Sequence, residues 1–156
     1  MTKMTNMTTK QKNIVKRWVA ALRSGEYRKG TGALRTKGKT RDSFCCLGVL
    51  CDLAVKAKVI KAPEDGDEVG DYFSYNNETD ILPAVVRDWA GLLDYAGAGA
   101  FTREKTGEGL DLIELNDGSD ISDVKPQSFA KIADLIEKHL ATDAKTTADP
   151  ADRLFV

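Results

Sequence analysis

Three cysteines are the residues whose type and spacing most directly suggest covalent chemistry. Cys45 and Cys46 are adjacent, and Cys51 follows five residues after Cys46. A thiol near the start of a helix ionises more readily, because the helix dipole favours the thiolate. With His139, the only histidine, as the base, Cys45 or Cys46 would make a cysteine-dependent hydrolase or transferase. Nothing in the sequence places His139 beside either thiol, so this enzyme is the alternative hypothesis.

The same residues do not predict a metal centre or a cofactor. Two adjacent cysteines, a third nearby and one distant histidine match no zinc-ligand spacing. The acidic stretch from Glu64 to Asp71 lacks the ligand order of an EF-hand, so we expect a solvated acidic loop there. The odd number of cysteines and the polar N-terminus favour reduced thiols in a cytosol. We therefore expect no metal, no cofactor and a location in the cytoplasm.

A second group of residues suggests anion binding. Gly30 and Gly32 lie among basic residues, and glycine lets backbone N–H groups approach an anion closely. A predicted helix N-terminus follows directly, and the combination suits a phosphate group. The Walker A pattern is absent, and a solvated hairpin tip is the alternative interpretation. The basic residues are Arg28, Lys29, Arg35, Lys37, Lys39 and Arg41.

Two further residues complete the predicted ligand-binding set. Gly48 interrupts an apolar helical run, where a glycine usually marks the close approach of another element or of a ligand. Trp89 lies in another predicted helix, and we place it with Gly48 in the wall of a pocket. The full predicted set is Arg28, Gly30, Gly32, Arg35, Lys37, Lys39, Arg41, Gly48 and Trp89.

The element that must position these residues is an apolar segment over residues 45–56. Its apolar residues recur at helical spacing on nearly every side, which predicts a buried central helix. Ser43 or Asp42 is expected to cap this helix. An N-terminal helix should begin at a capping box of Thr8 and Gln11, and a C-terminal helix should follow Pro126. Both terminal helices are expected to pack on the central one.

Short strands complete the expected fold. Residues 33–36 and 42–45 read as a hairpin around a turn at residues 37–39. Residues 110–115 alternate imperfectly and are predicted as another strand, while Pro83 belongs in the first turn of a further helix. We therefore predict an α+β fold: one domain over residues 1–156, with three or four helices packed against a small antiparallel sheet. Residues 1–7 and 141–156 are expected to be loose tails.

The bulk composition limits the partners. A chain of 156 residues with 42% hydrophobic and 30% charged residues is expected to fold around a core. Its net charge of −1 gives no global attraction to nucleic acid or to an anionic membrane. No apolar run approaches the roughly 20 residues that a membrane span needs. We expect no membrane partner, we rank nucleic acid below other partners, and homo-oligomer formation stays open.

Several sequence pieces, spread from about residue 18 to residue 137, resemble a group of small proteins of tailed bacteriophages. The most specific is the run Phe-Cys-Cys-Leu-Gly-Val-Leu-Cys-Asp-Leu at residues 44–53; the others are Trp18–Tyr27, Trp89–Leu92, Leu115–Asp117 and Phe129–Glu137. The resemblance implies expression inside an infected bacterium, so the expected cytoplasm is that of the host cell, and it transfers no catalytic residue. With the basic loop, it favours a phage-encoded binding protein with a counter-defence role. Its expected partner is a host protein or a small phosphate-bearing, nucleotide-like ligand.

Overall fold

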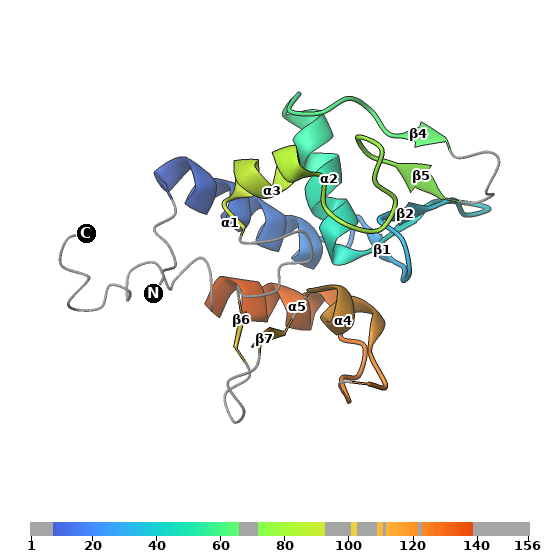
Figure 1. The fold of residues 1–156 in the computed structure, drawn as a ribbon, viewed down its shortest axis with the longest axis vertical. Helices are drawn as coiled ribbons and strands as arrows, with labels where there is room; N and C mark the ends of the chain where they lie inside the picture. Colours follow the sequence, from blue (N-terminus) through green and yellow to red (C-terminus); the bar gives the residue numbers. More distant parts are fainter. Residues whose placement is uncertain are drawn as a thin grey trace.

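A computed structural model describes residues 8–65, 72–92, 101–102, 109–110, 112–121 and 123–138. The described part has five helices and short strands, an α+β fold, which confirms the predicted class (Figure 1). The two expected tails and His139 lie outside the described residues. The helices are α1 (Thr9–Arg23), α2 (Cys46–Lys56), α3 (Ala84–Ala90), α4 (Leu112–Asp117) and α5 (Phe129–Ile136).

Helix α2 is the centre of the core, as predicted. Its residues from Cys46 to Cys51 are all buried, and α1, α3 and α4 all contact it. Cys45 is the N-cap, not Ser43 or Asp42, because β3 (Ser43–Phe44) continues up to that residue. The N-terminal end of α2 therefore lies inside the core. Burying a thiol at this N-cap costs less free energy than burying a carboxylate would.

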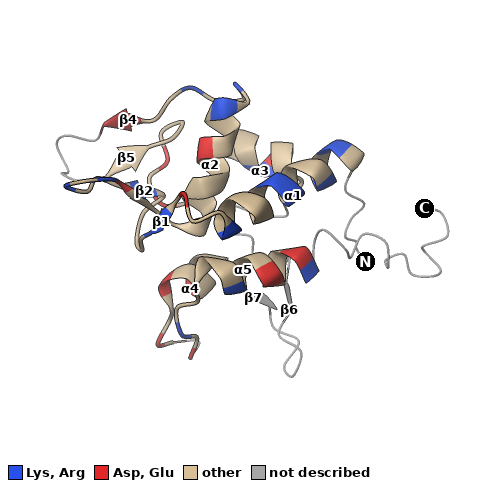
Figure 2. Cartoon of the chain, turned by 180° about the vertical axis from the view of Figure 1, so that it is seen from behind, with Lys and Arg blue, Asp and Glu red and all other residues tan. Residues whose placement is uncertain are grey.

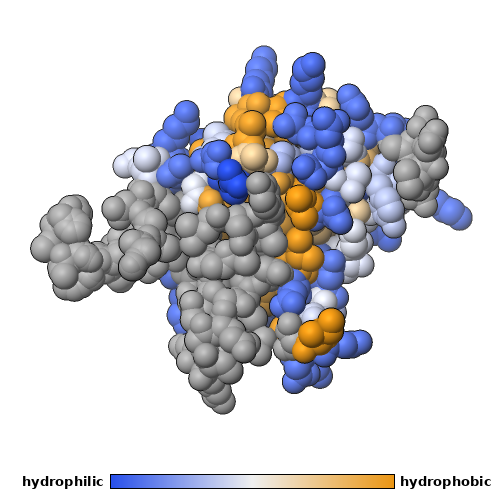
Figure 3. Space-filling model, in the orientation of Figure 1, coloured by the Kyte–Doolittle hydropathy of each residue, from blue (hydrophilic) through white to orange (hydrophobic). Residues whose placement is uncertain are grey.

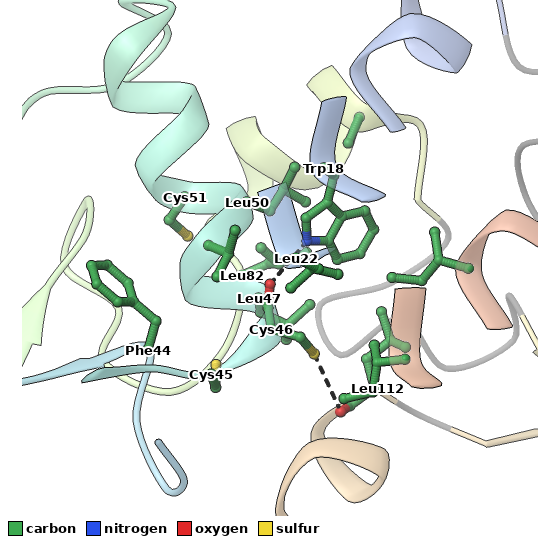
Figure 4. Packing of buried hydrophobic residues seen from close by; sticks show 14 of the residues in the cluster. Trp18, Leu22, Phe44, Cys45, Cys46, Leu47, Leu50, Cys51, Leu82 and Leu112 are labelled. Carbon is green, nitrogen blue, oxygen red and sulfur yellow. Dashed lines mark hydrogen bonds between the residues drawn. The ribbon is translucent and has the colours of Figure 1, made fainter. Parts of the chain in front are cut away.

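Helix α1 begins at the expected capping box. The Thr8 side chain accepts a hydrogen bond from the Gln11 N–H, and the Gln11 side chain accepts one from the Thr8 N–H, both at 3.0 Å. The Trp18 indole donates to the Cys46 carbonyl at 2.9 Å, which fixes α1 to the start of α2 (Figure 4). Helix α1 also packs along α5, and these contacts join the N-terminal and C-terminal helices across the core.

The segment at residues 110–115 was predicted as a strand, and this is wrong. Only Gly109 and Leu110 are extended, as β7, paired with β6 (Phe101–Thr102); α4 follows. Leu112 and Leu115 are buried at helical spacing, and Gly118 ends the helix with a φ of 85°. The alternation in this short run was imperfect, and packing against α2 and α5 favours the helix.

The predicted hairpin is present in a three-stranded sheet of order β1–β3–β2. Strand β2 (Arg35–Thr36) runs antiparallel to β3, and β1 (Arg28–Lys29) pairs with β3 in parallel. Strand β5 (Phe73–Ser74) pairs with β4 (Glu64–Asp65), and a bridge between Thr36 and Tyr72 joins this second pair to β2. The side chains of the hairpin therefore alternate between the two faces of a small, extended sheet.

No helix in the described ranges is both long enough and apolar enough to cross a bilayer.

Candidate functional site

The N-terminus of α2 is closed by the protein's own groups. The Cys46 N–H donates to the Asn116 side-chain oxygen at 3.0 Å, and the Gly48 N–H donates to the Cys45 sulfur at 3.4 Å. Asn116 is fully buried, and its amide also donates to the Gly30 carbonyl at 2.9 Å. The backbone donors that an anion would need at this helix end are therefore already used.

The two glycines of the predicted anion site are also engaged. Gly30 donates its N–H to the Phe44 carbonyl at 2.7 Å, and Gly32 donates to the Asp117 carboxylate at 3.2 Å. Asp117 and Asp80 line a small cavity of about 110 Å³ beside Cys45. An anion entering here would meet two carboxylates, so the geometry does not favour phosphate at Gly30 and Gly32.

All three cysteines are buried and reduced. Burial raises the pKa of Cys45 to about 11 and raises the pKa values of Cys46 and Cys51 well above 9.0. The Cys46 thiol donates to the Leu112 carbonyl at 3.6 Å, as only the protonated form can (Figure 4). The thiols are thus protonated near neutral pH, which is the opposite of an activated nucleophile.

The Cys45 pKa predicts an alkaline loss of stability. Folding raises this pKa from 9.0 to about 11. The protonated Cys45 thiol therefore contributes fully to the free energy of unfolding below pH 9, and this contribution is lost as the pH rises through 11. At pH 10.5 the Cys45 contribution to this loss should be about 2 kcal/mol. Urea unfolding at pH 8 and pH 10.5 should therefore show a smaller loss for Cys45→Ser than for the wild type. Equal losses would place a solvated thiol at position 45.

Within the described part of the chain, no cluster of three or more His, Cys, Asp or Glu side chains is placed to hold a metal ion.

The structure explains why residue 48 is a glycine. A Cβ atom at this position would overlap the carbonyl oxygen of Leu34, which also accepts the Cys45 N–H at 3.1 Å. The close approach indicated by the sequence is therefore made by the chain entering β2. Trp89 is half-buried on α3, where it packs against the core, and α3 contacts α1 and α2. Gly48 and Trp89 belong to the packing around α2.

Arg35 and Lys37 are held inside the hairpin. The Arg35 guanidinium lies between the rings of Phe44 and Phe73, at 4.9 and 4.7 Å from their centroids. It also pairs with Asp42 at 2.9 Å, and Lys37 pairs with Asp65 at 2.5 Å. Figure 2 shows the acidic strand β4 near the basic end of β2. These contacts offset the positive charge within the protein and fix the shape of the hairpin.

The opposite face of the sheet is partly exposed to solvent. Strand register places Arg28 beside Ser43, Ser43 beside Thr36, and Thr36 beside Tyr72. Residues paired in this way share a face, so they form a row about 14 Å long. Arg28 is exposed, Ser43 and Thr36 are half-buried, and Tyr72 is 43% exposed.

Two further cations lie in the turn that connects β2 and β3. Lys39 and Arg41 are exposed, and like Arg28 they form no ion pair with any acidic residue that the structure describes. We define the outer hairpin surface as Arg28, Thr36, Lys39, Arg41, Ser43 and Tyr72. The cations of this surface belong to the set predicted from the sequence, whereas its hydroxyls and aromatic ring were not predicted. Residue alternation in the strands was the available signal, but the partner of Tyr72 is remote in sequence.

Comparison with protein families matches residues 10–140 to a family described as Domain of unknown function (DUF8296), and the chain belongs to this family. No curated protein and no solved structure matches the chain.

Proposed function

We propose that this member of the DUF8296 family is a binding protein without covalent chemistry, and that its outer hairpin surface holds a phosphate-bearing or acidic group of a host factor. The observation that carries the proposal is the row of Arg28, Ser43, Thr36 and Tyr72, with Lys39 and Arg41 beside it. Cations and hydroxyls donate charge-assisted hydrogen bonds to an anion, and an exposed tyrosine provides a flat contact area.

The inner face of the hairpin favours this role. The contacts of Arg35 with Phe44, Phe73 and Asp42 hold the strands in place before a partner arrives. A surface that is already ordered loses less conformational entropy when it binds. Only the side chains of the outer cations then remain to be ordered when an anionic group binds.

The proposed setting is the cytoplasm of an infected bacterium, where such a protein would act against a host defence. This part of the proposal rests on the resemblance to tailed-bacteriophage proteins. The cysteine-dependent hydrolase or transferase has less support, because the pKa values of Cys45 and Cys46 are raised by burial. The position of His139 lies outside the described residues.

A triple variant tests the proposal: Arg28→Ala, Lys39→Ala and Arg41→Ala. Each is exposed and free of ion pairs among the described residues, so the Tm should stay within about 2 °C of the wild type. Partner binding should weaken at least about tenfold, since each charge-assisted hydrogen bond contributes about 1.5–3 kcal/mol. The measurement is quantitative enrichment of host proteins from infected-cell extract on immobilised protein, washed with increasing salt.

The matched control is Lys10→Ala, Lys16→Ala and Arg17→Ala on α1. These three cations are also exposed, and their removal changes the net charge by the same amount. The control should retain the same partner with the same salt dependence. Equal loss in both triple variants would reveal unspecific charge attraction, and full retention in the hairpin variant would refute the proposal.

A further inference from the structure

A groove lies at the other end of α2, away from the hairpin. It has a volume of about 650 Å³, which is in the range of small-molecule sites. Figure 3 shows apolar surface flanked by hydrophilic side chains near the C-terminal end of α2. The apolar lining residues are Val55, Val59, Ile60, Ala62 and Val85; the polar ones are Lys58, Lys61, Glu64, Asn76 and Asn77.

Lys58 occupies a backbone position that normally belongs to glycine. Its φ is 64°, its N–H donates to Val55 at 2.9 Å, and the next residue, Val59, donates to Ala54 at 2.8 Å. This is the Schellman pattern that ends a helix, in which the left-handed residue is usually glycine. A lysine here strains the backbone, and Lys58 is one of the residues that line the groove.

Asn76 and Asn77 add two more left-handed residues, with φ values of 53° and 74°. They form the two-residue turn between Tyr75 and Glu78, whose backbones exchange hydrogen bonds at 2.8 and 2.9 Å. Among the described residues, four non-glycine residues have positive φ, and three of them line this groove. Asparagine is favoured in such a turn, so Lys58 is the position among these three where the backbone is strained, and strain of this kind is a feature of ligand sites.

We infer that this groove binds a nucleoside monophosphate. The ammonium groups of Lys58 and Lys61 would pair with one phosphate. The apolar floor of Val55, Val59 and Val85 suits the flat face of a base, and the Asn76 and Asn77 amides suit its hydrogen-bonding edge. This site goes beyond the proposed function, because it shares no residue with the outer hairpin surface.

The charge of the groove selects a monophosphate over a triphosphate. Among the described lining residues, two lysines and Glu64 sum to a formal charge of about +1, which offsets a single phosphate better than three. The negative end of the α2 dipole also lies here, so a single phosphate must be held by Lys58 and Lys61, and further phosphates would meet unfavourable charge. Glu64 can accept a hydrogen bond from a ribose hydroxyl, a group that inorganic phosphate lacks.

Isothermal titration calorimetry tests the inference with adenosine and guanosine 5′-monophosphate as probes. At least one should bind with a Kd below about 100 μM, which is a modest affinity for a site of this size. The unphosphorylated nucleoside, inorganic phosphate and the corresponding triphosphate should each bind at least about tenfold more weakly. Failure of both monophosphates to bind below about 1 mM, or preference for the triphosphate, would overturn the inference.

Lys58→Gly separates binding from folding. Glycine relieves the backbone strain, so the Tm should rise by about 2–4 °C while monophosphate binding falls at least about tenfold. Lys61→Ala should weaken binding similarly, and Val85→Trp should fill the groove, since Val85 is 45% exposed. Lys16→Ala on α1 is the matched control and should bind like the wild type. Unchanged binding in both Lys58→Gly and Lys61→Ala would exclude this groove, and loss only in the outer hairpin variant would move the nucleotide to that surface.

Discussion

Replacing Gly48 with alanine is expected to lower the free energy of unfolding by about 3 kcal/mol or more. An added Cβ would overlap the Leu34 carbonyl oxygen, which is backbone and has no rotamer to change. Leu34 is itself fixed, because it accepts the Cys45 N–H and donates its own N–H to Thr79 at 2.7 Å. The helix propensity of alanine offsets only about 1 kcal/mol of this cost. Urea denaturation followed by circular dichroism measures the change.

Gly25→Ala is the control for this first prediction. Gly25 has a φ of 83°, but no atom lies within 4 Å of a Cβ placed there. Its replacement should cost only the strain of a left-handed alanine, about 1 kcal/mol. If Gly48→Ala destabilises the protein no more than Gly25→Ala, then α2 does not pack against the strand entry at Leu34.

Truncating Leu50 to alanine is expected to cost about 2–5 kcal/mol. Leu50 is fully buried on α2, and its side chain lies on the side of Trp18 (Figure 4). Removing its methyl groups loses hydrophobic burial and leaves a cavity among side chains that α1 and α2 hold in place. Denaturant unfolding with an unchanged m-value would report this loss as a change in stability alone.

Ile121→Ala, a truncation on the protein surface, is the control for the Leu50 prediction. Ile121 is 98% exposed, so its truncation should change the free energy of unfolding by less than about 0.5 kcal/mol. A cost below about 0.5 kcal/mol for Leu50→Ala as well would show that α2 is not the centre of the core.

The features predictable from sequence are those whose signals are local. The capping box of Thr8 and Gln11 lies within four residues, and the apolar run of α2 is too long and too uniform for a surface helix. The hairpin of β2 and β3 follows from a short turn between two extended segments. In each case neighbouring residues alone determine the conformation.

The remaining features depend on contacts between distant residues. Asn116 closes the start of α2 from a helix 70 positions away, and no local pattern around Asn116 predicts this contact. In the sequence Arg35 is one of several basic residues, and its contacts with Asp42 and Phe73 are seen only in the structure. The groove at Lys58 combines residues from 55 to 85 and is visible only in three dimensions. Propensity and periodicity do not report such tertiary contacts.

The central claim is that this protein binds a partner and performs no thiol chemistry. Native mass spectrometry of protein purified from infected cells tests it most directly, on the wild type, Cys45→Ser and the triple variant of Arg28, Lys39 and Arg41. The account predicts a non-covalent partner on the wild type and on Cys45→Ser, and its loss from the triple variant. A species covalently attached to Cys45 or Cys46, or loss of the partner from Cys45→Ser alone, would contradict it.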